Sequence, residues 1–430
     1  MNPAPEADAA RTDIQGRLSL APFRGLRFAS AKVGDPAAVI SPPYDMIDPI
    51  QAHRLAHSGA HNIVRLILPE LDEPDARLRY RRAARTLREW REEYALVLDS
   101  QPALYVYEQT GPAGNQRGLI GVLELPADDS GPVLPHEDVV DVVVADRQAL
   151  MHATGANPEP ILLTYEGGGP ASDLVEQYAD GPDPIVDAAT EDGTHHRLWP
   201  ITDPAQHAII AADLAPRRSL IADGHHRYAA YQRLAALGRP GTDRGLALLV
   251  DSKRHPLQVR GIHRWIPDLP VAPALAAAAE YFTVTEVPGG YKAALEALAR
   301  IGPERIAVAA VDRQRAWLIA DPKPELLAET IPHDRPESWR RLDATVLHLA
   351  LAQKIWGVPD TAERIRFDHD ARNAVIEAQR HHGLAVLLRP VAESTVLELA
   401  ATGIRMPRKS TAFAPKPATG LVLRLLDESY

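Results

Sequence analysis

One stretch of the sequence, LIADGHHRYAAYQRLAALG from Leu220 to Gly238, constrains the fold of this chain more than any other. It opens with apolar residues typical of a strand, passes through a glycine, and continues with strong helix formers that end near a second glycine. A strand that enters a helix through a tight turn is therefore predicted. Because a helix N-terminus presents unpaired N–H groups and a partial positive charge, this turn suits an anion, and phosphate is the natural one.

The turn itself carries Asp223, Gly224, His225, His226 and Arg227 in succession. Glycine allows a ligand to approach the backbone closely, and the two histidines and the arginine can add donors to phosphate oxygens. The aspartate can hold a hydrated magnesium ion at the phosphates, or it can cap the helix. The plainer interpretation is a capping aspartate followed by two surface histidines. Zinc is the weaker alternative, because helical zinc motifs place their histidines four residues apart.

Composition limits the classes of protein to which this chain can belong. With 430 residues, 45% hydrophobic and 24% charged, it is expected to form two or three globular domains. A net charge of -10 argues against a nucleic-acid partner, and no helix-turn-helix pattern follows the turn. The absence of cysteine excludes disulfides, thiolate zinc sites and cysteine nucleophiles. No signal peptide and no apolar run of the roughly 20 residues that a membrane span needs are visible, so we expect a soluble, cytoplasmic protein without a membrane partner.

Strand-like and helix-like segments are mixed along the chain, which predicts a mixed α and β class. The Arg-rich helix predicted at 75–96 interleaves acids with bases, so we interpret it as a solvated helix with internal ion pairs rather than a nucleic-acid motif. We expect a disordered tail at 1–18, an N-terminal α/β region at 19–130, a phosphate-binding core at 131–268, and a C-terminal α/β region at 269–430. A hairpin is predicted from 103–110 and 117–125; strands at 62–70, 159–165, 217–223, 245–252, 305–312, 316–320, 384–390 and 420–426; and helices at 227–237, 273–282, 292–301 and 344–355.

Two further segments contain residues that could join the turn. LPHEDV carries His136 and Glu137, and a glutamate there could act as general base for an alcohol if the fold brings it within reach. Taken alone, these two residues are equally typical of a simple turn. The basic loop at 406–417 contains Lys409, Ser410 and Lys416; it could close over an anionic ligand, or it could be a solubilising loop. It lacks the spacing of a P-loop.

Other polar residues are weaker candidates for substrate contacts. The segments FRGLRF, SPPYD, LPHED and GIHRWI could supply such contacts, or their polar residues could be simple turn and packing residues. The candidates in these segments are Arg24, Tyr44, Asp45, His136, His263 and Arg264.

Several of these motifs occur together in one family. FRGLRF, SPPYD, NIVRL, RGLIG, LPHE, IADGHHRYAA, LDATVLH and MPRKSTAFAPKPATGLV follow one another in the order typical of the domain of unknown function family 1015, which this chain resembles from about residue 20 to its end. The central region also resembles the ParB/sulfiredoxin-like fold, and within that superfamily it is similar to free serine kinases, which carry a closely related Asp-Gly-His turn. The resemblance implies an α+β fold with a ParB/sulfiredoxin-like central region and additional N- and C-terminal α/β regions.

The resemblance also implies a function. It suggests a small-molecule kinase, a phosphotransferase that transfers a phosphoryl group to the hydroxyl of a free amino acid such as L-serine. Glu137, Asp223 and His225 would be the catalytic residues, with Mg2+ at Asp223 and with ATP, ADP or pyrophosphate as the phosphate donor. The alternative is a nucleotide-dependent binding or switch protein without catalysis, which could form a homodimer. A histidine-based zinc hydrolase is a third hypothesis. The chain departs from the small kinases by its long N- and C-terminal regions and by an insert after residue 165.

Overall fold

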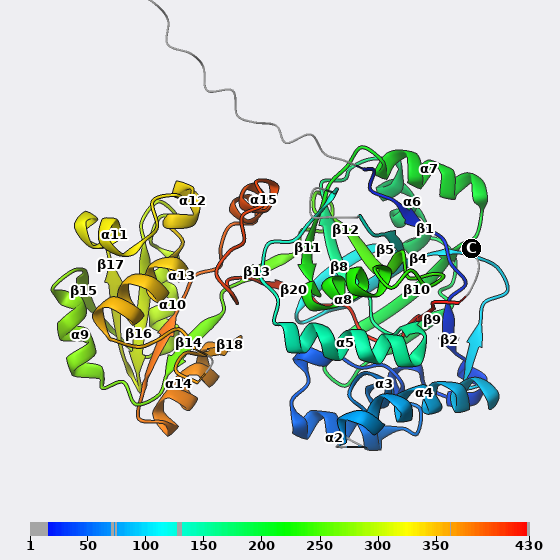
Figure 1. Cartoon of the computed structure of the whole chain (residues 1–430), viewed down its shortest axis with the longest axis horizontal. Helices are drawn as coiled ribbons and strands as arrows, with labels where there is room; N and C mark the ends of the chain where they lie inside the picture. Colours follow the sequence, from blue (N-terminus) through cyan, green and yellow to red (C-terminus); the bar gives the residue numbers. More distant parts are fainter. Residues whose placement is uncertain (1–15, 70–72, 74, 127–130, 362, 428–430) are drawn as a thin grey trace, which may run out of the picture.

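The computed structural model describes residues 16–69, 73, 75–126, 131–361 and 363–427. Most of the tail expected to be disordered, positions 1–15, lies outside this part of the chain. The described residues form two bodies that lie side by side, each built on its own β-sheet (Figure 1). They include both helices and strands in mixed and antiparallel sheets, which agrees with the predicted α+β class.

The larger body contains a mixed nine-stranded sheet, ordered β6-β11-β8-β12-β5-β4-β10-β9, with β1 added beside β5. It draws strands from both sides of residue 130, the boundary expected between the first two regions. Strand β11, which leads into the predicted turn, lies between β6 and β8 near one edge. The strands are β1 (Leu20–Ala21), β4 (Leu104–Gly111), β5 (Gly114–Glu124), β6 (Val133–Leu134), β8 (Ile161–Tyr165), β9 (Val186–Ala189), β10 (His195–Ile201), β11 (Ser219–Asp223) and β12 (Arg244–Asp251).

Both faces of this sheet are buried, which explains why strands such as β12 are apolar without alternation. On one face, Leu163 and Leu249 pack with side chains of α5 (Asp141–Thr154), α6 (Pro170–Ala179), α7 (Pro204–Leu214) and α8 (His225–Ala235). On the other, Leu162 and Leu248 pack with the short helix α3 (Val64–Ile67), with α4 (Ala76–Glu92) and with the end of the chain. Helix α2 (Pro49–Ser58) packs against α3.

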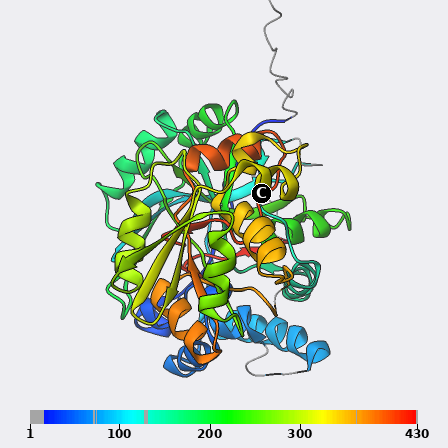
Figure 2. The ribbon, with the colours of Figure 1, turned by 90° about the vertical axis from the view of Figure 1, so that its left-hand side faces the viewer.

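The second body is a six-stranded antiparallel sheet, ordered β15-β17-β16-β19-β14-β18, and Figure 2 views it from the front. Its strands are β14 (His263–Ile266), β15 (Thr283–Pro288), β16 (Ala307–Asp312), β17 (Arg315–Ala320), β18 (Arg366–Asp368) and β19 (Leu384–Leu387). One face packs on α9 (Val271–Ala279), α11 (Pro324–Thr330), α13 (Asp343–Val346) and the π-helix Leu347–Ile355, and the other on α10 (Tyr291–Ala299) and α14 (Ala371–Arg380).

The last segment of the chain returns from the second body to the first. After α15 (Glu393–Ala401), β20 (Ala412–Ala414) pairs with β13 (Gln258–Arg260), and β21 (Arg424–Leu425) pairs with β7 (Ala156–Asn157). Between them, Leu423 pairs with Leu26 and is fully buried. The basic loop is thereby held between the two bodies. The remaining elements are β2 (Leu26–Phe28), α1 (Ser30–Val33), η1 (Pro36–Ala38), η2 (Tyr44–Met46), β3 (Leu96–Leu98) and α12 (Glu337–Arg340).

Most predicted elements are present, and one prediction was wrong. The hairpin 103–125, the strand at 159–165 and the helix at 75–96 are confirmed by β4 with β5, by β8 and by α4. The strand expected at 62–70 is instead the one-turn helix α3, because Asn62 accepts a hydrogen bond from the N–H of Val64 and donates to the carbonyls of Ala38 and Ile40. An apolar run that is buried on every side does not distinguish a strand from a helix.

Two C-terminal predictions are modified. The helix expected at 344–355 is mainly a π-helix, and of the strand expected at 420–426 only Arg424–Leu425 is a strand. Within the described residues, no helix combines the length and the apolar character needed to cross a membrane.

We expect Leu423→Ala to destabilise the protein, because Leu423 is fully buried and its backbone exchanges two hydrogen bonds of 2.9 Å with Leu26. The cavity left by the lost side chain should lower the free energy of unfolding by about 3 kcal/mol, measured by urea denaturation. Leu237→Ala is the control, because Leu237 is 52% exposed. Equal losses in the two variants would show that the final segment is not part of the core.

Candidate functional site

A cavity of about 210 Å³ lies between the two bodies, and it includes the predicted turn. The first body contributes Tyr44, Asp45, residues of the 136–140 segment and residues 222–227; the second contributes Phe367 and His369. Residues of the 408–416 loop complete the wall. Segments from the first body, the second body and the final loop, which are far apart in the sequence, therefore meet at the turn.

The strand–turn–helix unit has the predicted form. Strand β11 ends at Asp223, helix α8 begins at His225, and Gly224 between them has φ +95° and ψ 29°. A Cβ atom at Gly224 would lie 2.9 Å from Cγ2 of Ile161. Glycine is therefore required here both by its left-handed backbone and by the close approach of β8. The N-terminus of α8 opens onto the cavity.

Arg227 is buried beneath the turn, where it is held on several sides. Its Nη2 donates to Oδ2 of Asp223 at 2.6 Å and its Nη1 donates to the carbonyl of Pro160 at 2.5 Å. Burial opposes its charge, but the carboxylates of Glu159 and Asp223 outweigh this effect and raise the pKa of Arg227 above its ordinary value. Arg227 lines the cavity and also joins the side chain of Asp223 to the backbone just before β8.

Lys416 joins the basic loop to the turn and to the N-terminal segment. Its Nζ lies 2.6 Å from Oδ1 of Asp223 and 3.0 Å from Oδ2 of Asp45. Burial would lower the pKa of Lys416, but the two carboxylates raise it, Asp223 contributing more than Asp45. Burial would likewise raise the pKa of Asp45, yet Lys416 and Arg227 lower it to about 2. Asp45 and Lys416 therefore both stay charged across the neutral pH range.

Glu137 lines the same cavity. Among the described residues, no Lys, Arg or His nitrogen lies within 4 Å of its carboxylate, and Oε1 accepts a hydrogen bond of 3.3 Å from the hydroxyl of Thr411. Burial raises the pKa of Glu137 above its ordinary value, although Lys409 and the backbone and hydroxyl of Thr411 act in the opposite direction. A carboxylate with a raised pKa and no cationic partner is well suited to accept a proton.

The histidines of the turn have a role that the sequence did not indicate. Nε2 of His225 accepts the backbone N–H of His136 at 3.3 Å, and Nε2 of His226 accepts the backbone N–H of Val140 at 3.1 Å. The two rings thereby fasten the segment that carries Glu137 to the start of α8. Only Nδ1 of each ring is left to donate to a phosphate. Burial lowers the pKa of His136 to about 3 and the pKa of His225 well below 6.5.

Four of the predicted site residues lie away from the cavity. Arg24 donates to the carbonyl of Asp99 at 2.8 Å, and Ser410 donates to the carbonyl of Pro407 at 2.5 Å. His263 accepts the backbone N–H of Leu388. Arg264 is buried in the second body, where its Nε lies 3.2 Å from Nε2 of His348. Their side chains serve local packing and backbone contacts. Those that do line the cavity are Tyr44, Asp45, His136, Glu137, Asp223, Gly224, His225, His226, Arg227, Lys409 and Lys416.

The sequence did not indicate the residues that the second body adds. Phe367 and His369 lie at and just after β18, and they line the cavity together with Phe413. Burial, with Lys409 and Lys416, lowers the pKa of His369 to about 4, so its ring is neutral near pH 7. No motif marks RFDHD as a site segment, because its position opposite the turn depends only on the packing of the two bodies.

Metal binding can be tested against the side chains present. The described residues contain no group of three or more His, Cys, Asp or Glu side chains placed to hold a metal ion. A magnesium ion on a phosphate needs only one or two protein carboxylates, with phosphate oxygens and water as its other ligands. Asp45 and Asp223 supply two such carboxylates, but Nζ of Lys416 lies at the point on which they converge, so a magnesium ion held by both would have to displace this ammonium.

Fold and cavity together define an α+β protein in which a turn suited to anions and the carboxylate of Glu137 line one cavity at the junction of two bodies. The chain belongs to the family described as proteins of unknown function (DUF1015), whose sequence model matches residues 20–345. No curated protein matches this sequence.

The solved structures that match this chain are only weakly similar to it. A free serine kinase variant in complex with AMP has a TM-score of 0.36 and 16% identity, over 73% of this chain and 95% of that chain. A conserved hypothetical protein from Pyrococcus furiosus has a TM-score of 0.34 and 17% identity, over 69% and 93%. SbnI with a C-terminal truncation from Staphylococcus aureus has a TM-score of 0.34 and 12% identity, over 72% and 90%. These TM-scores are too low to establish a shared function.

We expect Lys416→Met to destabilise the fold at pH 7, because it leaves Asp45 and Asp223 facing one another without the ammonium between them. The free energy of unfolding should fall by about 3 kcal/mol, and adding Asp45→Asn should recover part of the loss. Denaturant unfolding of the single and double variants measures both effects. Lys253→Met, which removes an exposed ion pair with Glu166, is the matched control and should change little. If Lys416→Met behaves like the control, the cluster does not hold the three segments together.

Proposed function

We propose that this protein is a small-molecule kinase that transfers a phosphoryl group to an alcohol. The observation that carries the proposal is the convergence, in one cavity of about 210 Å³, of the α8 N-terminus, two lysines and the carboxylate of Glu137. Phosphoryl transfer depends mainly on positioning and on neutralising the charge of the phosphate, so such a cavity contains what the reaction needs.

Each group has a defined part in the reaction that we propose. The transferred phosphoryl group lies at the backbone N–H groups that follow Gly224, where the α8 dipole favours negative charge. Lys409 and Lys416 neutralise its oxygens, while Arg227 holds the turn in shape. The hydroxyl oxygen of the acceptor attacks phosphorus, the bond from phosphorus to the leaving phosphate oxygen breaks, and the hydroxyl proton passes to Glu137.

The acceptor and the donor are the finer parts of the proposal. A free amino acid such as L-serine is the acceptor that the sequence resemblance favours, and ATP, ADP or pyrophosphate could supply the phosphoryl group. Mg2+ would neutralise the donor phosphates, and Asp223 with Asp45 would hold it. Each of these choices concerns which molecule is bound and leaves the parts assigned to Glu137 and the turn unchanged.

One observation favours the second candidate, a nucleotide-dependent binding or switch protein. Both carboxylate oxygens of Asp223 already bind cations, Lys416 at Oδ1 and Arg227 at Oδ2. A site in which these charges are already balanced could hold a nucleotide without turning it over. This alternative requires nucleotide binding with no phosphorylated product.

We expect a phosphorus NMR time course with Mg2+, L-serine and each of the three donors in turn to show a new phosphomonoester resonance with one donor. Glu137→Gln should keep donor binding and lose transfer by about 100-fold or more, since a general base contributes a factor of this order. Asp223→Asn and Arg227→Ala should also lose transfer, and because each breaks the buried ion pair of 2.6 Å between these two residues, both should lower the melting temperature as well, so transfer is measured below the melting temperature of each variant.

Glu124→Gln is the matched control, because Glu124 is exposed at the end of β5. Unchanged turnover in Glu137→Gln would remove Glu137 from the mechanism. Transfer retained by either Asp223→Asn or Arg227→Ala while the variant is folded would indicate that its side chain only holds the turn and the start of α8 in place.

The pH dependence of the reaction follows from Glu137. The base must be ionised, and burial raises the pKa of Glu137 above its ordinary 4.5. Activity should therefore be complete at higher pH and fall as the pH drops through a pKa above 4.5, which the pH profile of kcat/KM measures. His136, with a pKa of about 3, cannot produce such a decline. A decline centred at or below pH 4.5 would contradict a buried glutamate base.

A further inference from the structure

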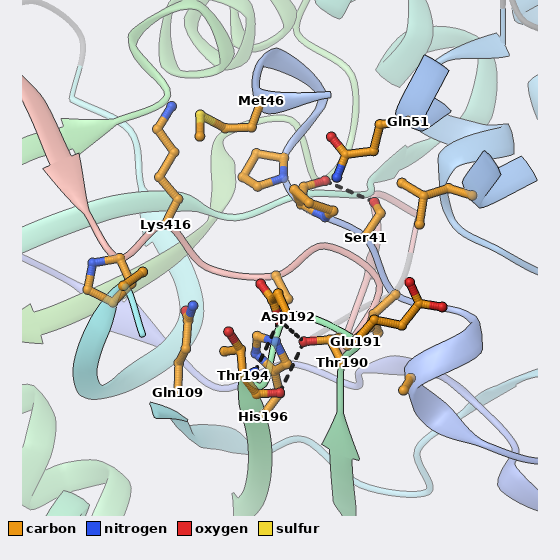
Figure 3. A pocket seen from close by; sticks show the side chains of 18 of the residues that line it. Ser41, Met46, Gln51, Gln109, Thr190, Glu191, Asp192, Thr194, His196 and Lys416 are labelled. Atoms are coloured by element: carbon orange, nitrogen blue, oxygen red, sulfur yellow. Dashed lines mark hydrogen bonds between the residues drawn. The ribbon is translucent and has the colours of Figure 1, made fainter. Parts of the chain in front are cut away.

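A second and larger cavity, of about 560 Å³, adjoins the first. The two share the lining residues His369, Ala412, Phe413 and Lys416. Figure 3 shows Met46, Gln51 and Ser41 on one side of this cavity, and Gln109, Thr194 and His196 on the other. Its volume lies in the range of small-molecule sites, and none of the residues predicted from the sequence to form the site, apart from Lys416, lines it.

The floor of the cavity offers a hydrogen-bond donor that the protein does not use. Oε1 of Gln109 accepts from the hydroxyl of Tyr107 at 3.1 Å and from Nε2 of Gln116 at 2.8 Å. These two bonds fix the amide, so that its Nε2 is the free end. Gln109 is only 6% exposed, and among the described residues its Nε2 has no hydrogen-bond acceptor. Nε2 of Gln109 is not one of the enclosed polar atoms that lack a partner among the described residues, so it is accessible from the cavity, where a ligand or water can accept its hydrogen bond.

His196 lies beside this amide and is neutral. Its Nδ1 is 2.8 Å from the hydroxyl of Tyr107, and burial lowers the pKa of His196 to about 4. The same tyrosine hydroxyl accepts the backbone N–H of Ala418 from the final segment of the chain. A neutral imidazole and an amide on one rigid network can recognise hydroxyl groups, which both donate and accept.

The opposite wall is mainly apolar. Ile40, Pro42, Met46 and Leu55 line it, and the hydroxyl of Ser41 donates to the carbonyl of Pro42. A ligand in the cavity would therefore meet carbon on one face and hydrogen-bonding groups on the other.

The charged side chains around the cavity are already partnered. Arg54 pairs with Glu191 at 3.4 Å across the rim, and Asp192 accepts from Thr190. Asp35 accepts the backbone N–H of Ala37, Arg260 donates to the carbonyl of Ala113, and Lys416 binds its two aspartates. The groups left for a ligand are thus neutral, and at Lys416 the positive charge is already balanced by Asp45 and Asp223.

We propose that the larger cavity binds a neutral, hydroxyl-bearing ring of the sugar class, either a free sugar or the ribose of a nucleoside. The ring would lay its carbon face on the apolar wall and its hydroxyl edge on Gln109 and His196. The end that carries or receives the phosphoryl group would point toward Lys416 and the turn. Only the orientation of this end toward the turn rests on the proposed function, and the binding of the ring does not.

Binding can be measured without catalysis, by saturation-transfer difference NMR on the full chain with adenosine and with D-glucose as probes. We expect one of them to bind, and we expect its affinity to fall at least 10-fold in Gln51→Trp and in Ala189→Trp, which fill the cavity from opposite walls. His53→Trp is the matched control, because His53 is exposed on the same helix as Gln51 and does not line the cavity. Asp223→Asn should keep this binding even where it abolishes transfer.

The two probes distinguish the two sources of the ring. Binding of adenosine alone assigns the ring to the nucleoside of a donor, and binding of D-glucose alone assigns it to a separate sugar. Failure of both probes to bind the wild-type chain, or equal binding by Gln51→Trp and His53→Trp, would overturn the proposal. If a probe binds the wild-type chain and loses affinity in Gln51→Trp but not in His53→Trp, while no phosphoryl transfer is detected, the larger site is supported and only the proposed kinase activity is rejected.

Discussion

The ammonium of Lys416 between Asp45 and Asp223 is the interaction on which the arrangement of the site depends. Three segments, from the N-terminal region, the β11–α8 turn and the final loop, meet at this one group. Removing partly buried charges from water is costly, and the cost is offset only when each charge has a close partner. The cluster therefore holds only if all three segments take their places together, and the two cavities share Lys416 because it stands at this meeting point.

The histidines of the turn show how one residue type can serve a purpose other than the one its motif indicates. Adjacent histidines beside a glycine and an arginine indicate anion binding, and His225 and His226 do line the cavity. Their Nε2 atoms, however, accept backbone N–H groups from His136 and Val140. The motif is thus also the structural connection that brings Glu137 to the turn, which explains why a glutamate 86 residues before Asp223 can face the same cavity.

Parts of the fold and of the site could be predicted because they are local. The turn at Gly224 follows from an apolar strand, a glycine and strong helix formers in immediate succession. Glu137 was a candidate because a glutamate in LPHEDV could act as a general base and because the resemblance to free serine kinases implies such a base. The helix at 64–67 was missed because the side-chain bonds of Asn62 reach residues 38 and 40, which no local pattern reveals. Of the two interpretations left open for Arg264, a substrate contact or a packing residue, the structure shows the second, because the side chain is buried in the second body.

The sequence by itself determined the α+β class, the strand–turn–helix unit and the group of residues that could bind an anion, since these depend on short-range propensity, backbone freedom and charge. Only the tertiary structure decided that Phe367 and His369 face the turn, that Lys416 binds two aspartates, and that Gln109 and His196 form the floor of a second cavity. These contacts join residues separated by tens to hundreds of positions. They arise because the last segment of the chain is buried against the first body, and burial of that kind depends on the whole core rather than on any one motif.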